Sequence, residues 1–424
     1  MMIASKWLRP LTVLLALTAV MGLTGCRRWP SSSVPDTLNP GLIAAQNGFG
    51  IDLYRKLVNE GTSDEEGIFI SPASIALALS MTMNGARGET QRAMARTLGY
   101  ESFSPETING SYATQLQQVA QRSADDQGIE LRMANGLWKH QELDFRKDFL
   151  QRNERFFKAT IRSLDFYAPA AADVINQWVS DQTEGLIPRL LEGIDPQTVL
   201  FIINAVYFKG DWTQPFDPRL TRTGPFYPVG GGQQDMPMMH QEGMFRHYRG
   251  QEFQAVRLPY GEQESLAMYI FLPDSNSNLD EFHEQLTYEN WEEWVANFSP
   301  KNGRISIPRF RLNYKTKLSA ALKDLGMAIA FDPGAADFSG MTETSPVANL
   351  SISEVVHQSF LLVNEEGTEA AAATSVGMRL TSAPVYQFDF VADRPFFLVI
   401  RDELNGAILF MGSVLAPAVA EAAQ

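Results

Sequence analysis

Apolar residues recur at the spacing of an α-helix along several stretches of the chain. Phe49, Leu53 and Leu57 follow one another at helical intervals, which places them on one helix face. Ser71-Pro72 supplies an N-cap residue followed by a proline in the first helical turn. The helices expected are one running from Leu42 past Leu57, Pro72–Met83, one that opens at Gly88, 105–122, 173–191 and 318–325. The helix over 105–122 is polar, and we expect it at the surface.

Strand-like patterns dominate the second half of the chain. Residues 199–208 form an almost unbroken apolar run, which predicts a central strand covered on both faces. Asn204 lies inside this run and needs a hydrogen-bonding partner there. Other strands are expected at 131–140, 266–272, 304–307, 396–400 and 407–414, the last two joined by a tight turn at Asn405-Gly406. Helices concentrated early and strands late indicate an α+β protein.

One segment, Glu365–Ser382, has features of both a strand and an exposed loop. At a period of two residues, one of its faces is small or apolar, and this face consists of Thr368, Ala370, Ala372, Thr374, Val376, Met378 and Leu380. Turn-forming residues flank this alternating run, with Glu365-Glu366-Gly367 before it and Thr381-Ser382-Ala383-Pro384 after it. Its four consecutive alanines also suit a helix. The residues alone leave strand, loop and helix open.

Five motifs resemble those of the serpin family. Residues 365–373 (EEGTEAAAA) are similar to the proximal hinge of the reactive-centre loop of inhibitory serpins, and residues 389–397 (DFVADRPFF) to the signature beyond that loop. The other motifs are residues 71–75, 204–212 and 338–342, so the resemblance extends over about residues 42–417. It implies the serpin fold, which is α+β with three β-sheets, about nine helices and an exposed reactive-centre loop. It also implies a central sheet that opens for an extra strand.

The resemblance assigns two functional parts to the loop segment. The hinge consists of Glu366, Gly367, Thr368, Glu369, Ala370, Ala371, Ala372 and Ala373. The usual family spacing from Gly367 puts the reactive bond between Thr381 and Ser382. Because loop length varies among relatives, Leu380 and Arg379 are the alternatives for the residue before the bond.

Two further sites are implied under and beside the central sheet. The shutter, under the centre of the sheet, consists of Ser71, Ser74, Asn204 and His357. Asn204 is the expected partner of His357, and an ordinary buried core histidine is the alternative. Trp212 corresponds to the breach tryptophan at the top of the sheet, and ordinary aromatic packing is the alternative for it.

The implied activity is suicide-substrate inhibition of serine proteases, with cysteine proteases as a second target class. The cleaved loop would insert into the central sheet while the protease is still attached as an acyl-enzyme, so the expected partner is a covalently bound target serine protease. The alternative is a non-inhibitory serpin-fold carrier, chaperone or interaction protein, which the small residues of the hinge disfavour. No cofactor is expected, and we expect a monomer.

Enzyme motifs are absent from the sequence. It has no G-x-S-x-G, H-E-x-x-H, P-loop or dinucleotide-binding motif, and one cysteine cannot form a C-x-x-C. The five histidines show no metal-ligand spacing. We therefore expect neither an enzyme nor a metal site. The formal net charge of −14 disfavours nucleic-acid binding, which requires clustered Lys and Arg.

The first 25 residues have the pattern of an export signal. Lys6 and Arg9 precede an apolar run over residues 11–23, which is too short for a convincing membrane span. Leu23-Thr24-Gly25-Cys26 resembles a bacterial lipobox, which implies lipidation of Cys26. An unused cysteine after an ordinary signal peptide is the alternative.

These features predict a domain organisation and a location. The expected segments are a signal peptide (1–25), a Ser/Pro-rich tether (26–41), the serpin domain (42–417) and a disordered tail (418–424). We expect an exported protein that is lipid-anchored to the outer membrane or cell surface. Without the lipid it would be periplasmic or extracellular.

Overall fold

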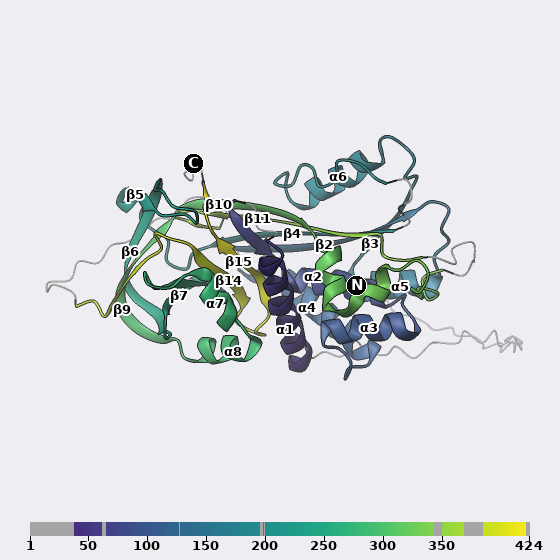
Figure 1. Cartoon of the computed structure of the whole chain (residues 1–424), viewed down its shortest axis with the longest axis horizontal. Helices are drawn as coiled ribbons and strands as arrows, with labels where there is room; N and C mark the ends of the chain where they lie inside the picture. Colours follow the sequence, from purple (N-terminus) through teal and green to yellow (C-terminus); the bar gives the residue numbers. More distant parts are fainter. Residues whose placement is uncertain are drawn as a thin grey trace, which may run out of the picture. The chain divides into compact units, whose positions relative to one another are not determined.

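The computed structural model describes residues 38–61, 65–126, 128–195, 198, 200–342, 350–368 and 385–420. Within these residues, strands form one hydrogen-bonded network of seven strands and another of nine, and helices pack against both (Figure 1). Helices dominate the first half and strands the second. The α+β class expected from the sequence is therefore confirmed.

The seven-stranded sheet is built around β4. Its strands are β2 (Ile129–His140), β3 (Thr160–Leu164), β4 (Leu200–Asp211), β10 (Phe310–Lys317), β11 (Glu354–Val363), β12 (Gly367–Thr368) and β16 (Ala418–Val419). They follow the order β16-β10-β11-β4-β2-β3, and β12 also pairs with β4. β4 runs antiparallel to β2 and parallel to β11. It is the central strand that the apolar run 199–208 predicts.

The nine-stranded network consists of two sheets that share the long strand β6. Its strands are β1 (Gly67–Ile70), β5 (Arg222–Phe226), β6 (Gln234–Arg249), β7 (Phe253–Tyr260), β8 (Leu266–Pro273), β9 (Ser299–Pro308), β13 (Phe388–Val391), β14 (Phe396–Asp402) and β15 (Ile408–Val414). Residues 234–238 of β6 pair with β5, residues 238–247 pair with β9, and β13 follows β9. The last residues of β6 pair with β7, which continues to β8, β14, β15 and β1. With the seven-stranded sheet, this makes the three sheets expected.

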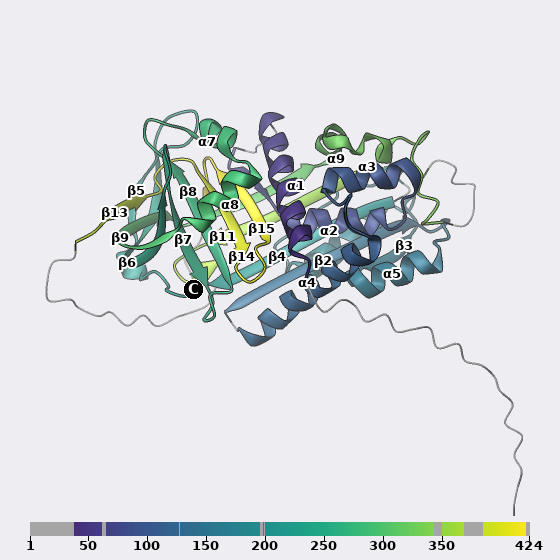
Figure 2. The same cartoon turned by 90° about the horizontal axis from the view of Figure 1, so that it is seen from below.

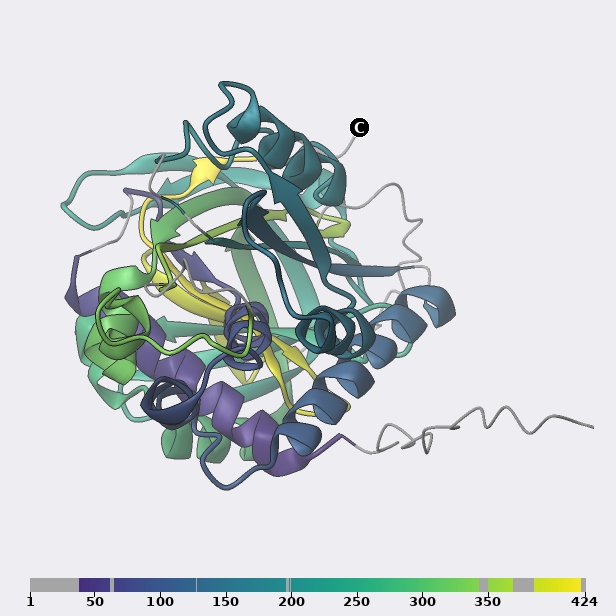
Figure 3. The ribbon, with the colours of Figure 1, turned by 90° about the vertical axis from the view of Figure 1, so that its right-hand side faces the viewer.

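Helices cover both faces of the seven-stranded sheet. The α-helices described are α1 (Pro40–Asn59), α2 (Pro72–Met83), α3 (Gly88–Leu98), α4 (Pro105–Asp125), α5 (Lys147–Phe157), α6 (Ala171–Gln182), α7 (Leu279–Gln285), α8 (Tyr288–Ala296) and α9 (Ser319–Leu322). Short turns of other helix types are η1 (Pro218–Leu220), η2 (Lys323–Met327) and η3 (Ala328–Phe331). Figures 1 and 3 show α6 on one face of this sheet and α2, α4 and α5 on the other. Figure 2 shows α7 and α8 beside β7 and β8.

Two apolar cores lie on the two sides of β4. Ile202, Val206 and Phe208 belong to the main core, which also includes α2. Phe201 and Ile203 belong to a smaller second core with Trp178 of α6, and Val356 of β11 also belongs to this second core. The alternation arises because successive side chains of a strand point to opposite faces. Burial on both faces explains why the sequence of β4 is almost continuously apolar.

Helix α2 is the core helix that the sequence predicts, and all of its residues are buried. Ser71 occupies the N-cap position, but its hydroxyl donates to the carbonyl oxygen of Leu409 at 2.7 Å instead of capping the helix. Pro72 still suits the first turn, where its missing N–H has no intrahelical partner to lose.

Two helix predictions need correction. Helix α4 is longer than expected and half of it is buried, because Tyr112 bonds the Tyr100 hydroxyl at 2.6 Å and Arg122 pairs with the buried carboxylate of Asp402. The helix expected to reach residue 191 ends at Gln182. Glu184 and Gly185 follow it with positive φ, which a helix cannot continue through.

The folded part extends further than expected at both ends. Helix α1 begins at Pro40, inside the expected tether, with Asn39 as a side-chain N-cap. Ala418–Val419 was expected in a disordered tail, but it pairs with β10 as β16. In the part of the chain that the structure describes, no helix is long and apolar enough to cross a membrane.

Candidate functional site

The seven-stranded sheet is partly open between β4 and β11. Residues 354–358 of β11 pair in parallel with residues 201–205 of β4. Further along β4, residues 206–209 pair with β2 on one edge, and no described strand pairs with them on the other. Gly367 and Thr368, which form β12, then pair antiparallel with Asp211 and Gly210 of β4. The described strands therefore leave a slot beside residues 206–209, and β12 occupies its upper end.

A tight turn at Asn364 brings the chain from β11 into β12. The Oδ1 atom of Asn364 accepts from the backbone N–H groups of Glu366 at 3.0 Å and Gly367 at 3.1 Å. The Asn364 N–H donates to the Gly367 carbonyl oxygen at 2.9 Å. This turn reverses the chain direction, so Gly367 and Thr368 run antiparallel to β4 and therefore also to β11, which is parallel to β4.

Trp212 holds this turn against the end of β4. Its backbone N–H donates to the carbonyl oxygen of Glu366 at 2.8 Å, and its indole Nε1 donates to that of Asn364 at 3.0 Å. Its ring stacks on Tyr260 with a centroid separation of 4.4 Å and an interplanar angle of 12°. Trp212 therefore lies at the top of the slot, where the resemblance places the breach, and it contacts the hinge directly.

Thr368 and Gly367 fit closely into the sheet. Thr368 is 1% exposed, and its hydroxyl lies 2.8 Å from the hydroxyl of Tyr260. Burial raises the pKa of Tyr260, so this tyrosine is neutral and can donate or accept in that hydrogen bond. A Cβ atom on Gly367 would lie 2.1 Å from the carbonyl oxygen of Gly210. Thr368 thus points inward, as the period-two pattern predicts.

Glu365 is a buried carboxylate beside the turn. It is 2% exposed, and it accepts from the Thr221 hydroxyl at 2.7 Å. Arg309 Nη1 lies 3.5 Å from its other oxygen, and the Phe216 N–H donates to its carbonyl oxygen at 2.7 Å. An acidic residue is tolerated here because it is both paired and hydrogen-bonded.

Ser71 and His357 meet in the shutter region. The N–H of Ser71 donates to Nε2 of His357 at 3.2 Å, and both residues are buried. Burial lowers the pKa of His357 to about 3, so the ring is neutral at physiological pH. Within the described residues, Nδ1 of His357 has no hydrogen-bond partner.

Ser74 and Asn204 form a second part of the shutter. The Ser74 hydroxyl is hydrogen-bonded to Oδ1 of Asn204, and Nδ2 of Asn204 donates to Oδ1 of Asn135 at 2.8 Å. Asn204 lies opposite His357 in the parallel register, but its amide bonds Ser74 and Asn135. The expected side-chain pairing of Asn204 with His357 is therefore replaced by two separate pairs, one serine with each residue.

Several predicted residues lie outside the described residues. They are Cys26, the hinge residues Glu369, Ala370, Ala371, Ala372 and Ala373, and the reactive-bond candidates Arg379, Leu380, Thr381 and Ser382. Among the residues that are described, no group of His, Cys, Asp and Glu side chains is arranged to hold a metal ion.

Sequence reasoning missed Asn364 and Tyr260, and it placed Glu365 in the hinge motif without predicting the burial and pairing of its side chain. Asn364 precedes a Glu-Glu-Gly turn, and a side-chain turn cap could have been inferred from that position. Tyr260 and Glu365 give no comparable local signal, because their partners Thr368, Thr221 and Arg309 come from distant parts of the sequence.

Comparisons with known proteins agree on one family. A family model described as Serpin (serine protease inhibitor) matches residues 44–417. Serpin B6 of Pongo abelii is 36% identical over 386 residues, which cover 89% of this chain and 100% of the relative. The leukocyte elastase inhibitor of Xenopus laevis is 34% identical over 386 residues, which cover 89% and 99%. The structure of the thermophilic serpin tengpin in its native state has a TM-score of 0.81 at 32% identity, covering 90% of this chain and 95% of that chain.

Proposed function

The chain belongs to the serpin family and has the serpin fold, and we propose that it is a suicide-substrate inhibitor of serine proteases. The observation that carries the proposal is the slot between β4 and β11. Two parallel strands with a gap between them accept a strand that runs antiparallel to both, and β12 already begins such a strand. The rest of the loop would extend β12 down this slot.

The pairing of β12 sets the register of the inserted strand. Continuing from Gly367 opposite Asp211 and Thr368 opposite Gly210, the strand would put Ala370 opposite Phe208 and Ala372 opposite Val206. Phe208 and Val206 both lie in the main core. Small side chains suit these positions, since an interior at close-packed density has no room for larger ones.

The covalent step is the ordinary first half of protease catalysis. The protease serine Oγ attacks the carbonyl carbon of the scissile bond, which we assign to Thr381-Ser382. The C–N bond breaks, the Ser382 amine leaves with a proton, and an ester joins Thr381 to the protease. The freed strand then enters the slot with the protease attached, and inhibition lasts because insertion outpaces hydrolysis of the ester. The intact form must therefore persist behind a kinetic barrier.

Hinge variants test the insertion step. Ala372→Arg would place a charge in the main core on insertion, at a cost of several kcal/mol. The variant should be cleaved at the same bond but release active protease, so the covalent complex on denaturing electrophoresis should give way to cleaved inhibitor. Ala371→Arg is the matched control, since the period-two pattern turns this side chain to the opposite face, and it should trap protease nearly as well as the parent chain.

Equal trapping by Ala372→Arg and the parent chain would overturn the insertion mechanism. If no covalent complex forms with any protease of a broad panel, the non-inhibitory carrier, chaperone or interaction protein becomes the better proposal. Thermal unfolding gives an independent measure, because the cleaved parent chain should unfold at a much higher temperature than the intact chain. Cleavage of the Ala372→Arg variant should raise its unfolding temperature much less.

The reactive bond can be tested separately. Thr381 before the bond suggests a protease with a small specificity pocket, Leu380 a chymotrypsin-like protease and Arg379 a trypsin-like one. Mass spectrometry of the peptide released on cleavage identifies the bond. If Arg379→Ala abolishes inhibition while Thr381→Arg leaves the target range unchanged, the assignment to Thr381 is wrong.

We also propose that Cys26 carries a lipid and anchors the domain outside the cytoplasm. The support is the lipobox-like segment Leu23-Thr24-Gly25-Cys26. In a bacterium with two membranes, Arg27 after the cysteine favours the outer membrane over the inner one. Mass spectrometry of the mature N-terminus decides the matter, and an unmodified Cys26 or a different first residue would refute it.

A further inference from the structure

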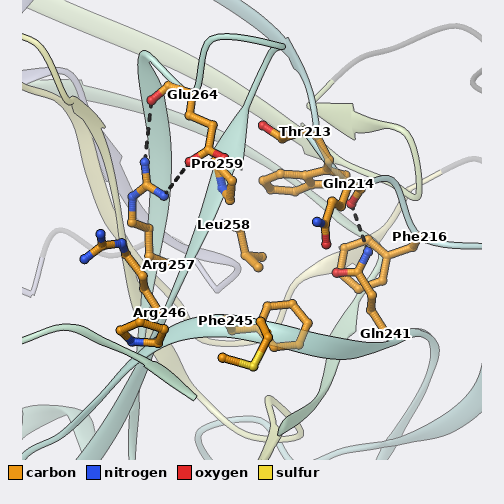
Figure 4. Close-up of a pocket in the computed structure, with 13 residues that line it drawn as sticks. Thr213, Gln214, Phe216, Gln241, Phe245, Arg246, Arg257, Leu258, Pro259 and Glu264 are labelled. Atoms are coloured by element: carbon orange, nitrogen blue, oxygen red, sulfur yellow. Dashed lines mark hydrogen bonds and ion pairs between the residues drawn. The ribbon is translucent and has the colours of Figure 1, made fainter. Parts of the chain in front are cut away.

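A pocket of about 200 Å³ is lined by Trp212 and by residues that follow it in the chain, together with residues of β6 and β7 (Figure 4). Its walls include the side chains of Trp212, Phe216, Phe245 and Leu258. All four of these residues are buried in the protein. An apolar cavity of about 150 Å³ is enough to hold benzene, so this pocket has room for one substituted aromatic ring.

The polar groups of the pocket lie around its apolar walls. Nε2 of Gln241 donates to the carbonyl oxygens of Gln214 at 2.9 Å and Pro215 at 3.2 Å, which fixes the amide at one edge. Figure 4 shows Arg246 and Arg257 close to each other at the other edge. A ligand here would therefore meet aromatic walls in the middle and guanidinium groups at one side.

The two arginines differ in how their charges are compensated. Nη1 of Arg257 lies 3.2 Å from a carboxylate oxygen of Glu264, and its Nε lies 3.0 Å from one of Glu403. Arg246 is exposed and makes no ion pair within the described part of the chain. Its one side-chain hydrogen bond to another described residue is a long one, 3.4 Å from Nη1 to the carbonyl oxygen of Phe298. Among the described residues, Arg246 is thus the guanidinium of the pocket that has no carboxylate partner, in a chain whose formal net charge is −14.

We propose that this pocket binds a small carboxylate that carries a single aromatic ring. The ring occupies the space between Trp212, Phe245 and Leu258, where burial of apolar surface favours it. The carboxylate lies at the edge near Arg246, which supplies a charge-assisted hydrogen bond. A neutral ligand of the same shape would gain the apolar contacts alone.

Occupancy of the pocket is linked to the position of the hinge. Trp212 and Phe216 form pocket walls, and their backbone N–H groups also hold the carbonyl oxygens of Glu366 and Glu365. A ligand that stabilises these walls therefore stabilises the docked hinge, and a docked hinge strengthens binding by the same factor. The binding itself does not depend on the proposed protease inhibition, so either proposal can fail without the other.

Titration calorimetry with the intact chain tests the site. The probes are 3-phenylpropionate and its neutral analogue 3-phenylpropanol. We expect the acid to bind about tenfold more tightly than the alcohol, the discrimination that one hydrogen bond to a charged group supplies. Arg246→Gln should remove this preference, whereas Arg311→Gln, which removes an exposed arginine of β10, should leave it unchanged.

Hydrogen–deuterium exchange tests the link to the hinge. Saturating 3-phenylpropionate should slow exchange in peptides that contain the amides of residues 212–216 and 364–368, and it should leave helix α3 unchanged. Equal affinity for acid and alcohol, or full binding by Arg246→Gln, would overturn the assignment of the ligand class. Tight binding without protection of residues 364–368 would overturn the coupling to the hinge.

Discussion

Replacing Tyr260 with phenylalanine would remove one hydroxyl from beneath the hinge and leave the ring in place. The ring is fully buried, stacks on Trp212 and contacts Phe208, so its packing should be retained. The hydroxyl of Thr368, which is 1% exposed, would lose its partner at 2.8 Å. The change therefore tests a single interaction between the hinge and the main core.

The expected cost follows from burial of the remaining group. An unsatisfied hydroxyl in the interior costs about 1–3 kcal/mol, which corresponds to an opening equilibrium about 5- to 150-fold more favourable. Thr368→Val leaves the Tyr260 hydroxyl unsatisfied and should cost a similar amount. In the double variant neither unpaired hydroxyl is present, so its total cost should be well below the sum of the two single costs.

Native-state hydrogen exchange supplies the measurement. The reporters are the amides of Trp212 and Gly367, which are bonded to Glu366 O and to Asn364 Oδ1. Both single variants should exchange faster at these amides, and Tyr248→Phe, a partly exposed tyrosine of β6, should not. Additive effects in the double variant would refute the reasoning, because the two hydroxyls would then be satisfied independently of each other.

Three further predictions concern other contacts. Burial lowers the pKa of His283 to about 4, so the unfolded chain binds more protons than the folded chain below pH 6.5. The free energy of unfolding from urea titrations should therefore fall between pH 6.5 and 4, by on the order of 3 kcal/mol from this histidine. His283→Gln should reduce this slope, to which the buried His357 also contributes, and an unchanged slope would contradict the prediction. Arg122→Met leaves the Asp402 carboxylate buried without its cation and should lower the free energy of unfolding in urea by about 3–5 kcal/mol. The double variant Arg122→Met with Asp402→Asn should recover much of this stability. If it does not, Arg122 acts through packing alone. Gly367→Ala should speed hydrogen exchange at the Trp212 amide, because the added Cβ atom cannot fit against Gly210. Gly48→Ala is the control, since a Cβ atom there would have no neighbour within 4 Å, and it should leave that amide unchanged. Equal protection of the amide in both variants would show that the sheet can adjust.

The pattern of apolar residues was sufficient to predict the helices and strands that are buried along their whole length. Strand β4 and helix α2 were both predicted, because continuous burial leaves a continuous apolar signal in the sequence. Helix α4 was expected at the surface because its sequence is polar, but its polar residues find buried partners far away in the chain, such as Asp402 for Arg122. Pattern reasoning cannot foresee such pairs.

In the candidate site, too, the sequence predicted which residues take part but not all of their side-chain partners. Thr368 was predicted to face inward because the alternation of small residues starts there, and Trp212 and the four shutter residues came from the family resemblance. The resemblance grouped Asn204 with His357, but it could not specify which serine each of them bonds. That choice depends on side-chain geometry at the start of α2, where Ser71 and Ser74 lie three residues apart on one helix face.

The second core has a consequence for how the intact protein responds to heat. Phe201 of β4 and Val356 of β11 belong to this core together with Trp178 of α6, so α6 spans the seam that must widen when a strand is added. Widening the seam has to loosen these apolar contacts before any new contact replaces them, which is the character of an unfolding step. Rates of such steps rise about 3–6-fold for every 10 °C. The working lifetime of the intact form should therefore shorten steeply on warming even where its equilibrium stability changes little, and larger side chains that fill the space under α6 should lengthen it.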